Sequence, residues 1–351
     1  MRGLGSRPPT GADRLLVGAI AGLTRLCEHV PIDRALAVAA GIGRLWVGLR
    51  GPRTRRVRAA LSRALPERTD AERARIERAV FVQLAQGLAE LLLLRGRQRE
   101  ALLARVEVVG LERLEAVRAG SGGGVLIVSA HLGNWELACA RAAALGIPLS
   151  IVYRPQRSAA IDRLLAELRL RSGREPGGVP VELIPRGRAG LAAVRALRRG
   201  RAVLVLLDQD ARREEGEFVT FFGRPACTRS APIALAALRG VPVVTAFSRR
   251  LPDGRCHRLE LGGALPLEPG AEEDPEILRR NVQRATDAIE AAIRVDPGQW
   301  IWTHRRWRTQ PRVDGPNARS DRPTPGPTEP PPEPPSPARS DRARAPAGDP
   351  K

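Results

Sequence analysis

The sequence predicts an α/β protein in which helices cover a largely parallel central sheet. Short runs rich in β-branched and other apolar residues recur along the middle of the chain, and strands are expected at 106–109, 125–129, 149–153, 181–185, 202–208, 241–248 and 256–261. Most of these runs are separated by stretches of helical character, at 134–145, 160–171, 188–199 and 229–239. Strands that alternate with helices favour a parallel sheet, whose ligands bind beyond the carboxyl ends of its strands.

A long helix is expected before the first strand. Thr69 and Glu72 have the spacing of a capping box, in which each residue satisfies a backbone N–H of the other. Behind them apolar residues recur at helical spacing, at Ile76, Val80, Leu84, Leu88 and Leu91. The predicted helix therefore begins near residue 70 and continues past residue 90.

The amino end holds two apolar runs that are too short to cross a bilayer. One extends from Leu15 to Leu23, and the second, residues 35–49, is interrupted by Arg44. A spanning helix needs about 20 consecutive apolar residues. We interpret residues 1–50 as amphipathic helices that lie on a membrane face, with Arg25, Arg44 and Arg50 reaching the headgroups. The alternative is a helical hairpin that packs on the domain core.

The carboxyl end has a different composition. Residues 314–351 hold 12 of the 31 prolines and almost no large apolar side chain, which predicts a disordered tail. Six basic and six acidic residues cancel there, so the formal charge of +20 lies on residues 1–313. We therefore expect three parts: the helices of residues 1–50, one domain over residues 51–313, and the tail over residues 314–351.

The composition narrows the function classes. Arginine supplies nearly all of the positive charge, since Lys351 is the only lysine, and such a field attracts phosphate groups. A nucleic-acid-binding protein would add a recognition fold or stacking aromatics, but aromatic residues are only 3% of the chain, so we expect no nucleic-acid partner. The four cysteines lie far apart in apolar runs, which indicates buried thiols and neither disulfides nor a zinc site.

Polar residues follow the apolar strand at 125–129 in the stretch HLGNWE. His131 and Glu136 would point about 140° apart on one continuous helix, at about 100° per residue. They can meet only if His131 lies in the turn and Glu136 in the first turn of the helix. A carboxylate there would accept the imidazole N–H, fix the tautomer and stabilise the imidazolium that forms when the other nitrogen takes a proton. A buried structural histidine is the alternative.

Charged side chains also follow later strands. Arg154, Arg186, Arg188, Asp208 and Asp210 come after the strands expected at 149–153, 181–185 and 202–208. Charged groups that converge at one edge of a sheet indicate a functional site, because packing of the core does not require charged side chains. A metal-dependent hydrolase that uses His131, Glu136 and the two aspartates as ligands remains an alternative.

The motifs together resemble a known family. HLGNWE occupies the slot of an H-x-x-x-x-D/E motif, and it is followed by VYRP with IDRLLAELRLRSG, by DQD with GEFVTFFGRPACT, and by WIWTHRRWRTQP. From about residue 15 to Pro311 the chain resembles the late acyltransferases of lipid A biosynthesis, the lauroyl and myristoyl transferases of the lysophospholipid acyltransferase superfamily. It departs from the family's usual pattern at Ala59 and Ala60, in place of Arg-Asn, and at Thr220, in place of proline.

The resemblance implies a glycerolipid acyltransferase-like fold and a reaction. A fatty acyl chain would move from acyl carrier protein or coenzyme A to a hydroxyl of a lipid A precursor, at the cytoplasmic face of the inner membrane. The protein would associate with that membrane in a peripheral or monotopic manner. Another glycolipid, such as a phosphatidylinositol mannoside, is an alternative acceptor. Because a thioester is already activated, we expect no metal, no cofactor and no covalent intermediate.

The same resemblance assigns roles to residues. His131 would be the general base and Glu136 its partner, with Arg169 and Asp210 as further catalytic residues. Residues expected to bind substrate are Asn134, Arg154, Arg188 and Asp208. We also expect Arg154, Arg169 and Arg188 to hold phosphate, either of the acceptor glycan or of the donor's phosphopantetheine arm. Glu90 matches an acidic position in the long early helix. Backbone N–H groups at the helix start after Gly133 would stabilise the oxyanion.

The last motif admits two interpretations. Trp300, Trp302 and Trp307 lie among arginines, and such a group suits the headgroup region of a bilayer. It suits a structural cap on the sheet equally well. We expect His304, in the same motif, to be a structural histidine.

Overall fold

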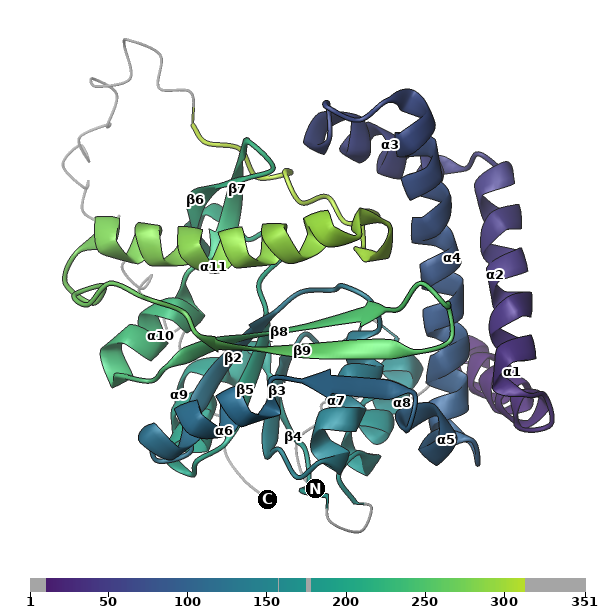
Figure 1. The fold of residues 1–351 in the computed structure, drawn as a ribbon, viewed down its shortest axis with the longest axis horizontal. Coiled ribbons are helices and arrows are strands. Elements are labelled where there is room, and N and C mark those ends of the chain that lie inside the picture. The colour runs from purple at the N-terminus through teal and green to yellow at the C-terminus, as the bar shows by residue number, and fades with distance from the viewer. Residues whose placement is uncertain (1–10, 157, 175–177, 313–351) are drawn as a thin grey trace, which may run out of the picture. The chain divides into compact units, whose positions relative to one another are not determined.

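The computed structural model describes residues 11–156, 158–174 and 178–312, so the predicted tail at 314–351 lies outside the described residues (Figure 1). A seven-stranded sheet has the order β1-β9-β8-β2-β5-β3-β4. Its strands are β1 (Val106–Val109), β2 (Val125–Ser129), β3 (Leu149–Tyr153), β4 (Glu182–Pro185), β5 (Ala202–Leu206), β8 (Val243–Arg250) and β9 (His257–Ala264). Strands β8, β2, β5, β3 and β4 are parallel, which confirms the predicted α/β fold.

Strand β9 is antiparallel to β8, and β1 pairs with β9 in parallel. The link from β8 to β9 is a short turn, in which Leu251 N donates to Cys256 O at 2.8 Å. A connection of this length can join only antiparallel neighbours, whereas the parallel strands require helical crossovers. The hairpin therefore reverses the direction of the last two strands, β9 and β1. The carboxyl ends of the five parallel strands still lie together along one side of the sheet.

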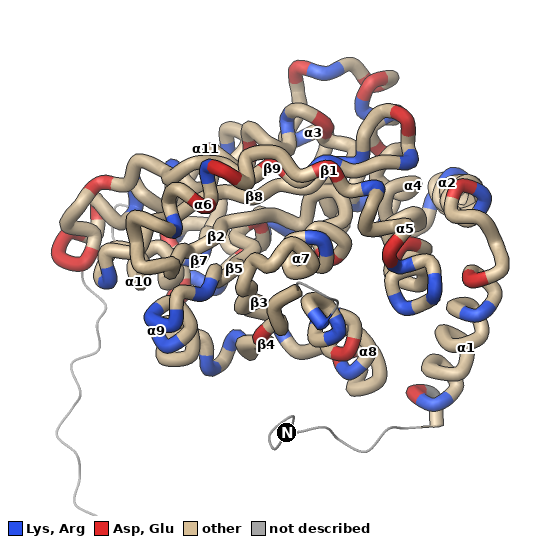
Figure 2. The backbone as a smooth tube through the Cα atoms, turned by 60° about the horizontal axis from the view of Figure 1, so that its bottom comes forward, with Lys and Arg blue, Asp and Glu red and all other residues tan. Residues whose placement is uncertain are grey.

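Helices surround the sheet. They are α1 (Gly11–Glu28), α2 (Ile32–Gly48), α3 (Pro52–Ala64), α4 (Asp70–Arg95), α5 (Arg99–Leu103), α6 (Leu111–Gly120), α7 (Trp135–Ala144), α8 (Ala159–Arg171), α9 (Ala189–Arg198), α10 (Ala231–Arg239) and α11 (Pro275–Val295). Short 3-10 turns are η1 (Arg186–Arg188), η2 (Arg213–Glu215) and η3 (Pro297–Gln299). In Figure 2, α9 carries basic positions and no acidic ones.

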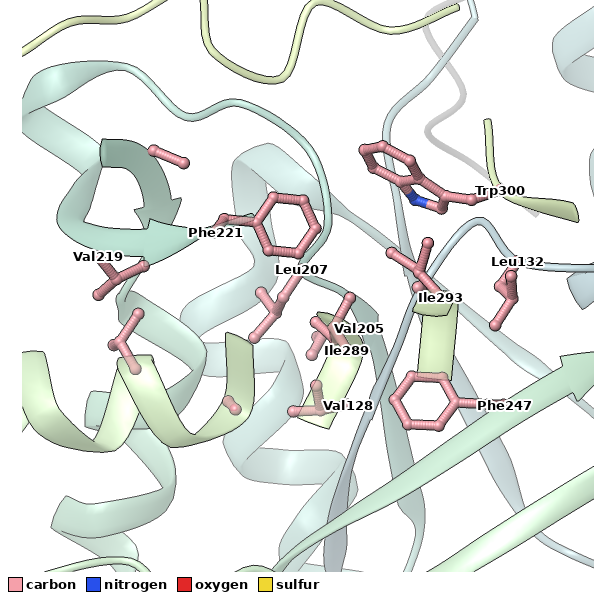
Figure 3. Close-up of a cluster of buried hydrophobic side chains, with 14 of the residues drawn as sticks. Val128, Leu132, Val205, Leu207, Val219, Phe221, Phe247, Ile289, Ile293 and Trp300 are labelled. Atoms are coloured by element: carbon pink, nitrogen blue, oxygen red, sulfur yellow. The ribbon is translucent and has the colours of Figure 1, made fainter. Parts of the chain in front are cut away.

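The core forms on both faces of the sheet, because successive side chains of a strand point to opposite faces. Val128 and Val205 face α9, α10 and α11, and this cluster includes Phe221, Ile289 and Trp300 (Figure 3). Ile127 and Leu204 face the other way and pack with apolar residues of α5, α7 and α8. All five residues of β2 are buried, so the strand that leads to His131 is fixed from both sides.

The capping box at the start of α4 is confirmed. Thr69 N donates to Glu72 Oε2 at 2.7 Å, and Glu72 N donates to Thr69 Oγ1 at 3.2 Å. Helix α2 lies along the outer side of α4 (Figures 1 and 2). A Cβ atom added at Gly43 would lie 2.6 Å from Phe81 O, so the two helices meet at backbone contact. Within the described residues, no helix combines the length and the apolar character needed to cross a membrane.

A separate hairpin, which the sequence pattern did not predict, comprises β6 (Gly216–Phe221) and β7 (Arg224–Arg229). It packs against α11, which was also not predicted. Thr220, where the family shows proline, donates its backbone N–H to Gln283 Oε1 at 2.7 Å, and Gln283 Nε2 donates back to Thr220 O at 2.9 Å. Proline could not make the first of these bonds, so the departure ties the hairpin to α11.

Candidate active site

His131 and Asp208 lie side by side at the carboxyl edge of the parallel strands. His131 follows β2 and Asp208 follows β5, and these strands pair in parallel, so their ends coincide. Asp208 Oδ1 accepts a hydrogen bond from His131 Nδ1 at 2.9 Å, and Asp208 Oδ2 accepts one from His131 N at 3.0 Å. The carboxylate that orients His131 is therefore Asp208. Glu136, which was predicted to do so, binds Arg169 instead. Contact of Asp208 with substrate stays a prediction.

Asp208 is held as a buried carboxylate. Its side chain is 0% exposed, and Trp300 Nε1 donates to Oδ2 at 2.8 Å. Burial opposes ionisation, but the charge and hydrogen bonds of His131 and the bond from Trp300 outweigh it and lower the pKa of Asp208 to about 2. An ionised carboxylate only accepts, so Nδ1 of His131 carries the proton. The other ring nitrogen, Nε2, therefore carries no proton in this state. It accepts a hydrogen bond from Gln209 Nε2 at 3.3 Å, and 19% of the His131 side chain is exposed.

Glu136 is paired with Arg169. Arg169 Nε donates to Glu136 Oε2 at 2.9 Å, Arg169 Nη2 donates to Glu136 Oε1, and the Arg169 guanidinium lies 5.6 Å from the centre of the Tyr153 ring. Burial favours the neutral form of Arg169, but Glu136 outweighs burial and raises the pKa of Arg169 above its ordinary value. The pair occupies the two helices α7 and α8. The two hydrogen bonds from Arg169 explain why Glu136 does not contact the His131 imidazole, because a bidentate guanidinium is a strong partner for a carboxylate.

Trp135 connects the two pairs. Its ring packs edge-on against the His131 ring, with centroids 4.7 Å apart. Its Nε1 donates to Glu136 Oε1 at 3.2 Å. Glu136 therefore influences His131 through the position of Trp135 and not by direct contact with the imidazole.

The turn between His131 and α7 is tightly fixed. Gly133 has φ +60°, and a Cβ there would lie 2.3 Å from Ser248 O on β8, so only glycine fits. Asn134 caps α7 by accepting from Leu137 N at 3.1 Å, and its Nδ2 donates to Glu90 Oε2 at 2.8 Å. With 4% of its surface exposed, Asn134 fixes the turn, and the prediction that it binds substrate is not supported by this geometry.

Glu90, from α4, gathers a buried polar network. It accepts from Arg250 Nη1 at 2.7 Å and Nη2 at 2.9 Å, from His257 Nε2 at 2.8 Å and from Asn134. Burial opposes its ionisation, but His257 and Arg250 lower the pKa of Glu90 to about 2. The network joins α4, β8 and β9 to the start of α7.

Asp210 binds Thr309 and His304. Its carboxylate accepts from Thr309 N at 3.1 Å and Thr309 Oγ1 at 3.0 Å, and Asp210 N donates to His304 Nε2 at 3.1 Å. Burial lowers the pKa of His304, which fits its role as an acceptor. The geometry makes Asp210 an anchor for the last described segment and does not support its predicted catalytic role, while His304 is structural, as expected.

The tryptophans of the last motif are part of the core. Trp300 is 2% exposed and Trp302 0%. Arg306, 1% exposed, donates from Nη1 to Cys227 O at 2.7 Å and lies over the Phe221 ring. The interpretation of this motif as a structural cap is therefore correct for these residues, and the interpretation as a cluster that binds lipid headgroups is wrong for them.

Arg154 and Arg188 are exposed, Arg154 after β3 and Arg188 at the end of η1. They lie at the same sheet edge as His131 and remain accessible to a substrate. Arg169 differs from them, since its guanidinium is bound to Glu136 and its side chain is only 12% exposed. Phosphate binding by these arginines stays a prediction.

Sequence reasoning missed two residues of the site. Trp300 fixes Asp208, and Gln209 places Nε2 at 3.3 Å from His131 Nε2. Gln209 lies between the two aspartates of the DQD motif, so its proximity to a strand end was a usable signal. Trp300 had no such signal, because its contact to Asp208 spans 92 residues.

A narrow apolar cavity of about 30 Å³ begins beside the site. It lies between α7 and the sheet, and its lining includes Ser129, Trp135, Ala138, Cys139 and Ala142. Burial raises the pKa of the Cys139 thiol to about 12, so this thiol stays protonated and unreactive at neutral pH. A larger cavity, of about 510 Å³, is lined by α4 and the β8–β9 turn and includes none of the predicted site residues.

Among the residues that the structure describes, no three His, Cys, Asp or Glu side chains converge as a metal-binding group. Of the four ligands considered for a metal-dependent hydrolase, His131 and Asp208 bind each other, Glu136 binds Arg169 and Asp210 binds Thr309. These residues therefore do not form the ligand set which that alternative requires.

A histidine oriented by a buried carboxylate, at the carboxyl edge of a parallel sheet, suits an α/β enzyme that uses general-base catalysis. Residues 13–309 match the model of the family described as bacterial lipid A biosynthesis acyltransferase. The chain belongs to this family, and it is an acyltransferase.

Individual relatives agree with the family. The chain is 27% identical over 291 residues to the lipid A biosynthesis lauroyltransferase of Escherichia coli K12, covering 83% of this chain and 90% of that protein. It is 25% identical over 282 residues to a lipid A biosynthesis acyltransferase of Haemophilus influenzae, covering 77% and 80%. It is 27% identical over 273 residues to the E. coli lipid A biosynthesis myristoyltransferase, covering 78% and 80%.

Proposed function

We propose that this protein transfers a fatty acyl chain from an acyl thioester, carried by acyl carrier protein or coenzyme A, to a hydroxyl of a lipid A precursor. The observation that carries this proposal is the His131–Asp208 pair at the carboxyl edge of the sheet. The formal charge of +20 supports substrates or carriers that bear negative charge.

The proposed reaction needs one base. Nε2 of His131 takes the proton of the acceptor hydroxyl as its oxygen attacks the thioester carbonyl, and Asp208 stabilises the imidazolium. The tetrahedral intermediate then collapses, the carbon–sulfur bond breaks, and the thiolate takes the proton from His131. Acyl transfer is complete when the ester and the free thiol leave.

The first turn of α7 is the proposed oxyanion site. Gly133 N is already bonded to Gln299 O at 3.0 Å, and Leu137 N is bonded to the Asn134 cap. No described residue accepts from the backbone N–H groups of Trp135 and Glu136. A helix amino terminus favours negative charge, so these two groups are the best placed to stabilise the developing oxyanion.

The acceptor can be tested by mass spectrometry of membrane lipids. A strain without this protein should accumulate lipid A that lacks one acyl chain, because the transfer step is missing. Wild-type protein should restore the chain, and the His131→Ala variant, expressed at the same level, should not. A strain whose lipid A is unchanged while a different glycolipid loses an acyl chain would refute the lipid A acceptor and favour the alternative.

We also propose that α1 and α2 hold the enzyme on the inner membrane. Val38, Ile42 and Leu45 recur on one face of α2, continue to Leu49, and are between 57% and 73% exposed. The opposite face of α2 packs on α4. Helix α1 adds further exposed apolar residues, among them Leu15 at 78%. Exposed apolar stripes of this kind, flanked by arginine, are typical of helices that lie in a membrane interface.

Changing Leu45 and Leu49 to serine should lower binding to vesicles that contain anionic lipid by about tenfold or more, because each buried leucine side chain contributes about 1.5–3 kcal/mol. Co-sedimentation at fixed lipid concentration measures this. Leu191→Ser with Leu238→Ser is the matched control, since these leucines on α9 and α10 are 62% and 59% exposed. Equal losses in both variants would contradict the assignment of the membrane face to α2.

A further inference from the structure

Four arginines gather at the carboxyl edge of β3 and β4. Arg154 follows β3 and Arg186 opens η1 directly after β4. Arg212 lies in the segment between β5 and η2, and Arg229 is the last residue of β7. All four act on one another or on Glu215, which is the last residue of η2. We call these residues the four-arginine cluster.

The cluster contains more positive charge than its carboxylate can balance. Glu215 Oε2 accepts from Arg186 Nη2 at 3.0 Å and is paired with Arg229 Nη2 at 2.8 Å. Arg154 and Arg212 are exposed, and neither guanidinium forms a hydrogen bond or ion pair with any described residue. Four guanidinium groups thus share one carboxylate, which leaves a surplus of three positive charges.

The surplus has an electrostatic cost that is visible at Arg186. Burial lowers the pKa of Arg186, and Arg229, Arg154 and Arg212 lower it further, against the opposing effect of Glu215. Like charges in close proximity repel, and a bound anion would relieve that repulsion. Guanidinium groups match the geometry of phosphate oxygens and bind them in pairs.

The cluster and His131 lie on one sheet edge. In the order β2-β5-β3-β4, His131 follows the first strand and Arg186 the last. Adjacent strands are about 4.8 Å apart, so the two ends are about 14 Å from each other. A glycolipid headgroup or a carrier arm can span this distance, with its phosphate on the arginines and its reacting atom at His131.

We propose that the four-arginine cluster binds a phosphate group of a substrate while the reacting atom lies at His131. This inference rests on the proposed acyl transfer. The phosphate can belong to the sugar of the acceptor or to the phosphopantetheine of the donor. Both share one chemistry, an exposed phosphate ester with at least two oxygens for guanidinium groups, and the experiment below separates them.

The test compares Arg154→Gln/Arg212→Gln with Arg195→Gln/Arg198→Gln. The first variant removes the two unpaired members of the cluster, so the fold should be preserved. The second removes the same charge from exposed positions on α9, which ends beside the amino edge of β5. Each is assayed with a phosphorylated lipid A precursor, with the same precursor after phosphatase treatment, and with donors that either carry phosphopantetheine or are simple thioesters without phosphate.

The cluster variant should raise the KM for the phosphate-bearing substrate by about tenfold or more, because hydrogen bonds to charged groups are worth about 1.5–3 kcal/mol. It should leave the KM for the matching substrate without phosphate at the wild-type value. A rise confined to the phosphorylated acceptor assigns the phosphate to the acceptor, and a rise confined to the phosphopantetheine donor assigns it to the donor. Equal effects in the control variant, or no effect in the cluster variant, would overturn the proposal.

Binding separates this inference from the proposed reaction. His131→Ala protein keeps the cluster intact, and its affinity for the phosphorylated and phosphatase-treated precursors can be measured by calorimetry without turnover. The phosphorylated molecule, or in the donor case coenzyme A against its phosphate-free analogue, should bind at least tenfold more tightly. If wild-type protein transfers no acyl chain and this preference is still present, the proposed function fails and the phosphate site stands. If transfer occurs without the preference, the proposed function stands and the phosphate site fails.

Discussion

Replacing His131 with alanine is expected to slow acyl transfer by about 10²–10⁴-fold, because the acceptor hydroxyl loses its general base. Replacing Asp208 with asparagine should also slow the reaction, since asparagine cannot stabilise an imidazolium by charge. The double variant should be about as slow as His131→Ala alone, because an orienting carboxylate without a base has no effect. Steady-state rates of acyl transfer at fixed pH measure all three.

Glu136 provides the matched control for this prediction. It is a buried carboxylate of the same turn, but it binds Arg169. The effects of Glu136→Gln and Arg169→Lys should therefore be non-additive with each other, whereas those of Asp208→Asn should be non-additive with His131→Ala. If Asp208→Asn keeps wild-type turnover, while Glu136→Gln is non-additive with His131→Ala, then glutamate is the partner in solution and the mechanism proposed here is wrong.

Replacing Glu90 with alanine should destabilise the protein by about 3–5 kcal/mol, because it leaves the buried guanidinium of Arg250 without its counter-charge. Arg250 is 7% exposed and Glu90 0%. A loss of this size lowers the melting temperature by about 10 °C in a domain of this length. Thermal unfolding followed by circular dichroism measures the change. Acyl transfer should fall as well, since Asn134 loses its link to α4.

The exposed pair Arg279 and Glu276 is the control for that experiment. Their side chains are 44% and 63% exposed, so Glu276→Ala should cost less than about 1 kcal/mol. A second variant, Glu90→Leu with Arg250→Met, removes both buried charges and should recover part of the lost stability. A melting temperature for Glu90→Ala within 2 °C of wild type, at about 2–4 °C per kcal/mol, would contradict the role given to the network.

Local signals in the sequence predicted much of the fold. The strand that precedes His131 is a run of four apolar residues followed by Ser129, and the structure has it at Val125–Ser129 as expected. The start of α4 followed from Thr69 and Glu72, whose contacts span only three residues. The hairpin β6–β7 was missed because each of its strands has only six residues and combines apolar residues with charged residues, proline or glycine. The reversal of β9 was also not predicted, since apolar periodicity does not encode strand direction.

The site could be predicted less fully, because its contacts depend on which of several competing partners each side chain reaches. The sequence places Glu136 and Asp208 at adjacent positions near His131 in a parallel sheet. It does not reveal that Arg169, on α8, takes Glu136 by a bidentate pair, which leaves Asp208 for the imidazole. Asp208 and Asp210 are separated by one residue, yet they face different partners, His131 and Thr309.

The bond from Trp300 to Asp208 has a consequence for synthesis of the chain. His131 and Asp208 emerge from the ribosome well before Trp300, and amino-terminal parts of a protein begin to fold first. Until Trp300 arrives, burial of the Asp208 carboxylate is unfavourable because one of its hydrogen bonds would be unmade. Strand β2 also lacks part of the core on one face. We expect the nascent chain to hold an open, hydrated site until Trp300 has left the ribosome. Synthesis of the segment that carries Trp300 therefore decides when a ribosome-bound chain becomes an active enzyme.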